Sequence, residues 1–548
     1  MKKSKTVTET RPLPWAWILT AAAIVVAFVI YSPSLNGPFV YDDQYLPFRM
    51  ANYENAPFSA WIKGVRPFLM ASYWMNFKAS GLETGSYHIV NVLLHALNAI
   101  LLGFAIRRLA NSAWLGAFTG AVFLVHPLNT EAVSYVASRS ENLTVFFFFA
   151  AFVVFLYRKT NVIGFGTSAI VLVLFGAACL SKEYAVTLPV LLLLTDVYFN
   201  HDGGFKANWR LYAPITLVAA AGGVFVWNIL QSADTAGFGM KELSASDYFF
   251  TQCRSIWIYI AKFAIPVGLN VDHDFAISRD PMDQGAIFGL LALLGVCAAA
   301  YFYRKRFPLA SYGWFVFLLL IAPTSSFVPI RDVLVERRVY LPSLGLLLIV
   351  AEACRRIKIP KAVLAIPLLI FAVMTYQRNQ LWADPLALFR DAAEKSPQKW
   401  RVQFQVADAL YRNGECNAAA AAYEKTDKLD KPDYRVMINW ANALDCAGQP
   451  QQAMEKAEKA FALEKTAQAR AMVGMLHAKG NRSQEALTAL NEAIQIDANF
   501  DPAFFYRGNV YSMLNDLDRA AADYRRALEI NPRNEQAARG LSRVTNRR

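Results

Sequence analysis

Charged residues are scarce in this chain: Asp, Glu, Lys and Arg make up only 18% of its 548 residues, whereas 55% are hydrophobic. This balance excludes an intrinsically disordered protein and favours one that crosses a membrane several times. The sequence also lacks a glycine-rich phosphate loop and a Cys/His set with metal-ligand spacing. A nucleotide site and a structural zinc site are therefore not predicted.

Long apolar segments fill the chain as far as about residue 380. A membrane-spanning helix needs about 20 mainly apolar residues, and about eleven spans are predicted, some of them short. They are 15–32, 86–106, 113–126, 142–157, 163–180, 185–199, 211–230, 286–303, 309–323, 338–354 and 361–376. Because charges become frequent beyond this point, we predict a membrane domain over residues 1–380 and a second domain over residues 381–548.

Basic residues recur in every second loop between these segments, and the positive-inside rule makes those loops and the N-terminus cytoplasmic. The other loops, and the C-terminal domain after an odd number of spans, are then external. No small-residue cleavage site follows the first segment, which predicts a retained signal anchor. The basic residues assigned to the cytoplasm are Lys2, Lys3, Lys5, Arg11, Arg107, Arg108, Arg158, Lys159, Lys206, Arg210, Arg304, Lys305, Arg306, Arg355, Arg356, Lys358 and Lys361.

The C-terminal part repeats with a period of about 34 residues, which is typical of tetratricopeptide repeats. Small residues recur at the second helix of each unit, glycines at the turn between helices, and prolines between units. These residues are Ala453, Ala486, Ala520, Ala460, Ala493, Ala527, Gly414, Gly448, Gly480, Pro397, Pro432 and Pro532. We predict about four repeats and a capping helix from Asn534, forming a solenoid that binds a peptide or protein.

Cysteine is infrequent, with six residues in the chain. Cys416 and Cys446 are predicted at the same edge of the first two repeats, where a disulfide and two separate thiols are equally compatible with the spacing. An external compartment would allow the bond to persist. The other four are predicted to be buried apolar residues: Cys179, Cys253, Cys297 and Cys354.

Paired carboxylates follow the first apolar segment, at Asp42 and Asp43. Two adjacent carboxylates near a bilayer surface suit a general base or a divalent metal site. The alternative is a solvated pair at the start of an ordinary loop. The segment from Phe249 to Ile265, interrupted by Arg254 and Lys262, is predicted to be an interfacial amphipathic helix.

The other external loops combine carboxylates with Lys, Arg and His. Such a mixture suits a lipid-linked phosphate, because Arg binds phosphate in a bidentate manner and Lys acts as a point charge. Alone, Lys182 with Glu183 or Glu336 with Arg337 would be read as a local salt bridge, and His126 as a helix-end residue. Asn91 and His95 would form a polar pair. The further candidates are Arg66, His88, Glu131, Arg139, Glu141 and Arg338.

These residues lie in strings that resemble the transmembrane and tetratricopeptide-repeat O-mannosyltransferases. The matching strings are Tyr41–Asp43, Arg66-Pro67, Tyr87–His95, His126–Glu141, Ser181–Glu183, Glu336–Ser343 and Arg378–Phe389. The resemblance follows the membrane half in order and includes the arrangement of spans before repeats. It implies an all-α fold, with a polytopic GT-C-type membrane domain followed by an α-solenoid.

The resemblance also implies a glycosyltransferase that moves a mannose-like sugar from a polyprenyl phosphate to a protein Ser or Thr hydroxyl. Asp42 or Asp43 is predicted to be the base, with Glu131 as second candidate, and Asp42 and Asp43 to hold a divalent cation such as Mg²⁺ or Mn²⁺. Donor phosphate contacts are predicted for Lys182, Arg337, Arg338 and Arg139.

Two other functions remain open at this stage: the same donor with a lipid or glycan acceptor, and a membrane-anchored repeat scaffold without catalysis. The predicted partners are the lipid-linked sugar, membrane lipid and a protein engaged by the repeats, but not nucleic acid. The short loops favour a bacterial inner membrane with periplasmic repeats over an ER membrane with luminal repeats.

Overall fold

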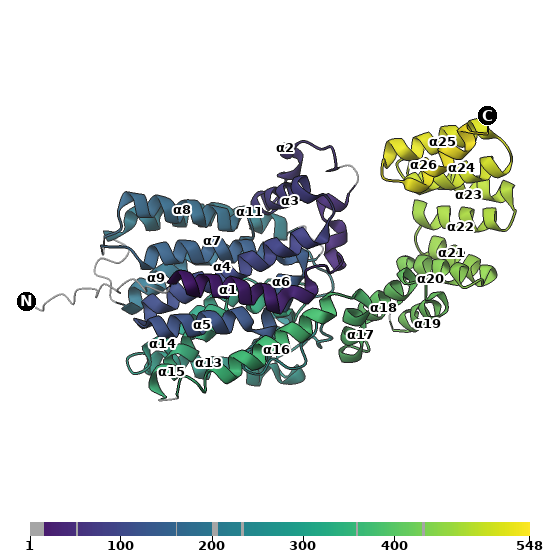
Figure 1. Cartoon of the computed structure of the whole chain (residues 1–548). Helices are drawn as coiled ribbons and strands as arrows, with labels where there is room; N and C mark the ends of the chain where they lie inside the picture. The colour runs from purple at the N-terminus through teal and green to yellow at the C-terminus, as the bar shows by residue number, and fades with distance from the viewer. Residues whose placement is uncertain are drawn as a thin grey trace, which may run out of the picture. The chain divides into compact units, whose positions relative to one another are not determined.

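The computed structural model describes residues 16–50, 53–160, 162–199, 207–231, 235–357, 360–429 and 433–547. Within these ranges the regular elements are helices, and the only extended pairing is one antiparallel bridge between Ala236 and Ile330. The predicted all-α fold is confirmed (Figure 1). Some residues named above lie outside the described ranges: Lys2, Lys3, Lys5, Arg11, Lys206, Lys358 and Pro432.

The described chain separates into two compact units. The first, here called the membrane unit, comprises the described residues up to Phe48 and those from Pro57 to Asp384. The second, here called the repeat unit, comprises the described residues of Arg49–Ala56 and those from Pro385 onward. The short segment Arg49–Ala56 belongs to the repeat unit, where Glu54 pairs with Arg533 at 2.6 Å.

Each predicted span coincides with a helix of the membrane unit. These helices are α1 (Ala16–Tyr31), α4 (Thr84–Ala110), α5 (Ala113–Val125), α7 (Arg139–Leu156), α8 (Phe165–Cys179), α9 (Leu188–Phe199), α11 (Trp209–Leu230), α13 (Ala286–Phe302), α14 (Pro308–Ile321), α15 (Ser343–Arg356) and α16 (Ala365–Trp382). Among the described residues, five segments are long and apolar enough to cross a membrane, and α5, α8 and α14 are apolar but shorter. The chain therefore has the helices of a membrane protein, while eleven spans and their orientation stay predictions.

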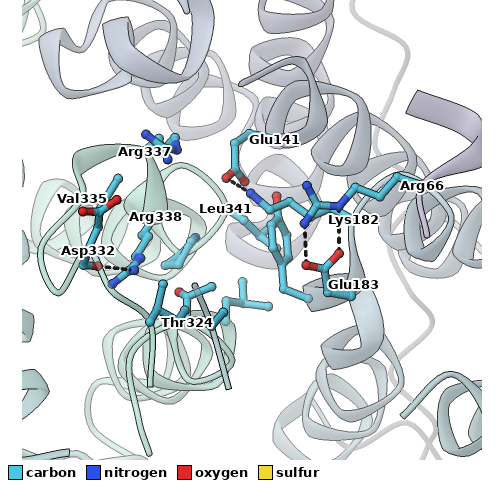
Figure 2. Close-up of a pocket in the computed structure, with 15 residues that line it drawn as sticks. Arg66, Glu141, Lys182, Glu183, Thr324, Asp332, Val335, Arg337, Arg338 and Leu341 are labelled. Atoms are coloured by element: carbon cyan, nitrogen blue, oxygen red, sulfur yellow. Dashed lines mark hydrogen bonds and ion pairs between the residues drawn. The ribbon is translucent and has the colours of Figure 1, made fainter. Parts of the chain in front are cut away.

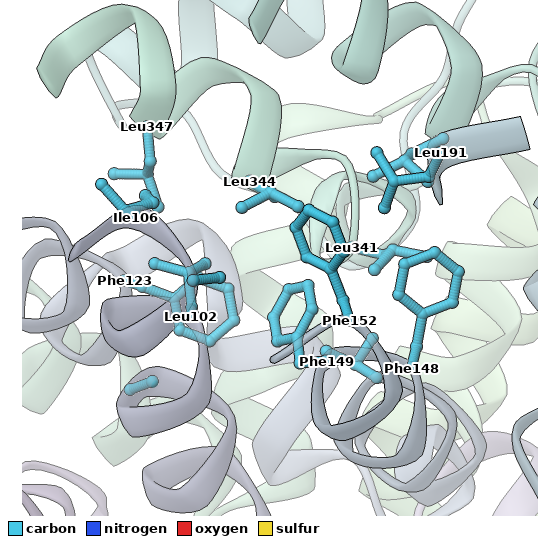
Figure 3. Close-up of a cluster of buried hydrophobic side chains, with 14 of the residues drawn as sticks. Leu102, Ile106, Phe123, Phe148, Phe149, Phe152, Leu191, Leu341, Leu344 and Leu347 are labelled. Carbon is cyan, nitrogen blue, oxygen red and sulfur yellow. The ribbon is translucent and has the colours of Figure 1, made fainter. Parts of the chain in front are cut away.

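The core of the membrane unit is apolar and close-packed. Phenylalanines on α7 and leucines on α15 meet side chains of α4, α5 and α9 (Figure 3). Helices α4 and α5 approach closely because glycines face each other: a Cβ on Gly116 would collide with the backbone oxygen of Gly103. Gly313 and Gly345 play the same role between α14 and α15. This packing fixes the helix ends from which the connecting loops project.

Short helical turns and one 14-residue helix, α3, connect the long helices of the membrane unit. They are η1 (Ser32–Ser34), η2 (Tyr41–Tyr45), η3 (Pro47–Arg49), α2 (Phe58–Trp61), α3 (Pro67–Ser80), η5 (Pro127–Asn129), α6 (Thr130–Ser134), η6 (Val136–Ser138), η7 (Glu183–Thr187), η8 (Asp283–Gly285) and η9 (Glu336–Val339). The predicted amphipathic segment forms α12 (Ala245–Ala264), whose Tyr248, Ile256 and Tyr259 are buried. Its helical state is confirmed, and its interfacial location stays a prediction.

The repeat unit is a series of helix pairs. Its helices are α17 (Pro385–Lys395), α18 (Trp400–Arg412), α19 (Cys416–Asp427), α20 (Tyr434–Cys446), α21 (Pro450–Leu463), α22 (Ala467–Lys479), α23 (Ser483–Ile496), α24 (Asp501–Met513), α25 (Leu517–Ile530) and α26 (Glu535–Thr545). The six recurring alanines are fully buried, as expected for helices that pack closely. Gly414 and Gly448 take positive φ at the first two turns, whereas in the third turn Asn481, not Gly480, does so.

A disulfide joins the first two repeats. Cys416, at the start of α19, is bonded to Cys446, at the end of α20, and their Cα atoms are 5.6 Å apart. Of the two alternatives left open by the sequence, the structure has the bridge, and the other four cysteines are free thiols, of which Cys253 is buried and the rest are partly buried.

Candidate active site

A cavity of about 210 Å³ opens between the ends of the membrane-unit helices. Four predicted cations, Arg66, Lys182, Arg337 and Arg338, line it together with Glu141 and Glu183 (Figure 2). Arg66 and Lys182 lie immediately before α3 and η7, and the other four lie in α7, η7 and η9. Residues up to 272 positions apart in the chain thus line one cavity. The structure therefore gathers most of the predicted phosphate-binding side chains in one place.

Two ion pairs form one side of this cavity. Lys182 pairs with Glu141, and Arg66 pairs with Glu183 at 2.6 Å. The alternative prediction of a local salt bridge between Lys182 and Glu183 is therefore wrong, because Lys182 binds Glu141 and Glu183 binds Arg66. Burial lowers the pKa of Lys182, and the Glu141 carboxylate opposes that shift. Burial likewise raises the pKa of Glu183, but Arg66 holds it below its ordinary value.

Arg337 is held by Glu131 rather than by its sequence neighbour. Its guanidinium pairs with the Glu131 carboxylate, and its backbone N–H donates to Glu131 Oε2 at 3.0 Å. Burial raises the pKa of Glu131, although Arg337 opposes the shift. A carboxylate engaged in this way is poorly placed to accept a substrate proton, so Glu131 is better suited to orienting Arg337.

Glu336 points away from the cavity and fastens a different segment. Its Oε1 accepts the Asn270 backbone N–H at 2.7 Å and faces His273 Nε2 at 2.9 Å. Lys262 and Arg378 approach the same carboxylate at 3.7 Å. The alternative local pair of Glu336 with Arg337 is therefore wrong, because η9 directs the two side chains to opposite sides.

Arg338 differs from the other lining cations. Its guanidinium donates to the Tyr248 hydroxyl at 3.0 Å and to the backbone oxygens of Asp332 and Val333 at 2.5 and 3.4 Å. These acceptors are neutral, and within the described ranges no carboxylate forms an ion pair with it. Among the lining cations, Arg338 is thus the one that can bind an incoming anion without first breaking an ion pair.

The adjacent carboxylates Asp42 and Asp43 have different environments. Asp43 is buried: its Oδ2 accepts the Val40 N–H at 3.1 Å and its Oδ1 accepts the Ala137 N–H at 2.7 Å. Burial raises the pKa of Asp43 to about 7, against the lowering effect of these backbone donors. Asp42 is exposed, and its backbone N–H donates to the Tyr135 hydroxyl at 2.8 Å. Asp43 therefore joins its own loop to the segment around Ala137 by hydrogen bonds, whereas the Asp42 carboxylate faces solvent.

The donor set at Asp42 and Asp43 does not fit a metal ion held by protein alone. Both Asp43 oxygens already accept backbone hydrogen bonds, and the described residues contain no group of three His, Cys, Asp or Glu that could hold a metal ion. The predicted Mg²⁺ or Mn²⁺ stays a prediction.

Seven predicted site residues lie outside the cavity lining: Asp42, Asp43, His88, His126, Glu131, Arg139 and Glu336. Arg139 is fully buried between the rings of Tyr73 and Tyr87, at 4.7 and 5.5 Å from their centroids. Its guanidinium donates to Asn91 and Asn76 side chains and to backbone oxygens, which suits a structural role. The ring of His88 faces the Gly37 oxygen at 3.1 Å and that of His126 the Phe263 oxygen at 2.9 Å.

Several tyrosines at the site were not predicted from the sequence. Tyr184 lines the cavity, Tyr248 accepts from Arg338, and Tyr135 accepts from Asp42. The charge pattern contains no signal for them, although Tyr135 lies within the string His126–Glu141. Asn91 and His95 do not pair with each other: Asn91 donates to Val133 and Tyr135 oxygens, and His95 contacts the Tyr340 hydroxyl and the Leu124 oxygen.

Comparison with known proteins supports the resemblance seen in the sequence. The chain is 22% identical to protein O-mannosyl-transferase TMTC3 of Homo sapiens, with 86% of this chain and 58% of that protein covered. It is 26% identical to protein O-mannosyl-transferase F38B6.6 of Caenorhabditis elegans, with coverage of 68% and 54%. The chain thus spans little more than half the length of these relatives.

The repeat unit has independent matches. Tetratricopeptide-repeat family models match residues 372–433 and 502–534. Among solved structures, YrrB, described as a tetratricopeptide-repeat protein with an unusual peptide-binding site, is 22% identical and covers 32% of this chain and 92% of its own, at a TM-score of 0.25. The chain is therefore an all-helical membrane protein with tetratricopeptide repeats, and it is similar to the protein O-mannosyl-transferases over most of its length.

Proposed function

We propose that this protein is a membrane glycosyltransferase that moves a mannose-like sugar from a polyprenyl phosphate to a Ser or Thr hydroxyl of a protein. The observation that supports this best is the cavity lined by Arg338, Arg337 and Lys182. Tyr135 links it to the proposed base, because its side chain contacts both Arg337 and the backbone of the exposed Asp42. A phosphate diester and the monoester it becomes on leaving both need such cations. The similarity to protein O-mannosyl-transferases favours mannose and a protein acceptor.

In the proposed reaction the acceptor oxygen attacks the anomeric carbon of the sugar. The new carbon–oxygen bond forms as the bond between that carbon and the phosphate oxygen breaks, and the polyprenyl phosphate leaves with the electron pair. The acceptor proton passes to the Asp42 carboxylate, which is exposed and able to accept it. The additional negative charge on the leaving phosphate is stabilised by Arg338, with Arg337 and Lys182 nearby.

The repeat unit supplies the proposed site for the acceptor protein. Stacked tetratricopeptide helices present a concave surface that typically binds peptides. The disulfide of Cys416 and Cys446 suits an oxidising compartment, such as a periplasm or an ER lumen. We propose that the cavity and the repeats share that external side of the membrane, and the short loops favour a bacterial inner membrane.

The test is a transfer assay with the purified, detergent-solubilised full chain. Radiolabelled polyprenyl-phosphate mannose, glucose and N-acetylglucosamine are each supplied with membrane extract, and label is measured separately in protein, lipid and glycan fractions. We expect mannose in the protein fraction, and we expect Asp42→Asn to lower that transfer about 100-fold or more. Label in lipid or glycan would establish the second candidate acceptor. Absence of transfer from every donor, with the folded protein intact, would favour the non-catalytic repeat scaffold.

A further inference from the structure

Tyr135 lies where the carboxylate loop meets the cation-bearing turn. It is 4% exposed, in the bend between α6 and η6. Its hydroxyl accepts the Asp42 backbone N–H at 2.8 Å, although 93 positions separate the two residues. The guanidinium carbon of Arg337 lies 5.7 Å from the centroid of the Tyr135 ring. The Tyr135 side chain thus contacts both the segment that carries the proposed base, Asp42, and a proposed phosphate-binding cation, Arg337.

The surroundings of Tyr135 hold it rigidly. Its backbone oxygen accepts from Asn91 Nδ2 at 3.3 Å and from the Ser138 backbone N–H at 3.0 Å. Its ring stacks near Trp382, at 6.1 Å between centroids, and meets Tyr41 edge-on at 6.2 Å. A tyrosine held rigidly at its backbone and at its ring can keep two loops at a fixed separation, which a mobile surface tyrosine cannot.

We infer that Tyr135 is a positioning residue that holds the Asp42 backbone in register with Arg337, so that base and phosphate-binding cation face one sugar. This inference rests on the proposed function. Asp42 is exposed, so the backbone hydrogen bond to Tyr135 restrains where its carboxylate lies. A displacement of about 1 Å in a reacting group reduces rates as much as 100-fold, so a loosened anchor would be visible in kcat.

The hydroxyl and the ring of Tyr135 can be removed one at a time. Tyr135→Phe keeps the ring beside Arg337 but removes the acceptor for the Asp42 N–H. We expect kcat to fall about fivefold to tenfold, as for the loss of one backbone hydrogen bond, with the KM for donor unchanged. Tyr135→Leu also removes the ring, and we expect the KM for donor to rise as well, since Arg337 loses its cation–π contact.

A double-mutant cycle with Asp42→Asn distinguishes positioning from general destabilisation. If Tyr135 acts through Asp42, adding Tyr135→Phe to Asp42→Asn should leave the residual rate unchanged, because the group being positioned no longer accepts a proton. A further fivefold loss in the Asp42→Asn background, or a full rate in Tyr135→Phe alone, would overturn the inference. Thermal unfolding of each variant reports the folded fraction, and rates are expressed per folded molecule.

The matched control is Tyr312→Phe, which removes another buried tyrosine hydroxyl of the same unit. Tyr312 contacts Thr195 Oγ1 at 2.6 Å and lies outside the cavity lining. We expect a similar stability loss with an unchanged rate. If Asp42→Asn and Arg338→Ala are both fully active, the proposed function fails. If they are impaired while Tyr135→Phe is not, only the positioning role fails.

Discussion

Arg337 and Glu131 lie 206 positions apart in the chain and form an ion pair in which the Arg337 backbone N–H donates to the same carboxylate at 3.0 Å. Glu131 is almost completely buried, at 2% exposure of its side chain. The pair joins η9 to α6 and sets the side of the turn from which Arg337 reaches the cavity. Because the Glu131 carboxylate is buried, its negative charge is stabilised mainly by the ion pair with Arg337.

Arg337→Ala should therefore destabilise the protein as well as impair transfer. Removal of one partner leaves an uncompensated buried carboxylate, and we expect a loss of about 3 kcal/mol in the free energy of unfolding. The double variant Arg337→Gln with Glu131→Gln exchanges the ion pair for a neutral hydrogen-bonded pair. It should recover most of the stability but not the donor KM. Recovery of both in chemical denaturation and kinetic assays would make the pair purely structural.

Arg338→Ala should show the opposite pattern. Because Arg338 donates to neutral oxygens, its removal leaves no buried carboxylate behind, and stability should change by about 1 kcal/mol. Loss of a charge-assisted phosphate contact should raise the donor KM about tenfold or more. Steady-state kinetics over a range of polyprenyl-phosphate sugar concentrations measures the effect. The control is Arg279→Ala, an arginine 69% exposed outside the cavity, and an equal KM change there would argue against a specific contact.

Asp42→Asn should reduce kcat about 100-fold or more, as expected for loss of a general base. The substitution keeps the backbone N–H that Tyr135 accepts, so stability and donor KM should remain close to those of the parent protein. Asp280→Asn, at another exposed carboxylate of the membrane unit, serves as control. Single-turnover transfer compares the three proteins. A wild-type rate in Asp42→Asn would remove Asp42 from the mechanism.

Asp43 should make stability depend on pH. Its pKa in the folded protein is raised to about 7 from 3.8, so the folded state retains a proton that the unfolded state has lost. Stability from this group is present below about pH 4 and is lost as the pH rises to about 7, with a slope of about 1.4 kcal/mol per pH unit. Thermal unfolding of the parent and Asp43→Asn from pH 4 to 8 tests this. A difference between them that does not vary with pH would refute the ionisation of Asp43.

The disulfide should stabilise the repeat unit in an oxidising compartment. A bridge that spans 30 positions contributes about 3–4 kcal/mol in the chain-entropy model. We expect reductant, or Cys416→Ser with Cys446→Ser, to lower the unfolding temperature of the repeats without changing that of the membrane unit. Maleimide labelling of the unfolded, unreduced protein should modify four cysteines. Labelling of all six in protein taken from its native membrane would contradict the external placement of the repeats.

Most of the fold could be read from periodicity and hydrophobicity. The apolar segments predicted as spans are all helices, and the recurring alanines of the repeats are buried, because both patterns follow local geometry and burial. The disulfide was foreseen as one of two equal options, and the structure selected it. The sequence does not indicate that Asn481, rather than Gly480, takes the left-handed conformation in the third turn, since both residue types adopt it.

The site was predictable in its charges but not in their pairing. Charged side chains beside apolar segments are expensive to desolvate, so the sequence indicates Lys182, Arg337, Arg338 and Arg139 as phosphate contacts and Arg66 as a further candidate, of which all but Arg139 line the cavity. The sequence could not say that Arg139 is enclosed by tyrosines, that Glu336 faces away from Arg337, or that Asp43 and Asp42 differ in exposure. Short 3₁₀ turns at η2, η7 and η9 turn successive side chains to different neighbours, and those neighbours come from distant helices. Composition and periodicity thus determined the class of protein and the chemistry available to it, whereas helix packing alone decided which charges meet, because ion pairs and hydrogen bonds depend on distances that no linear pattern encodes.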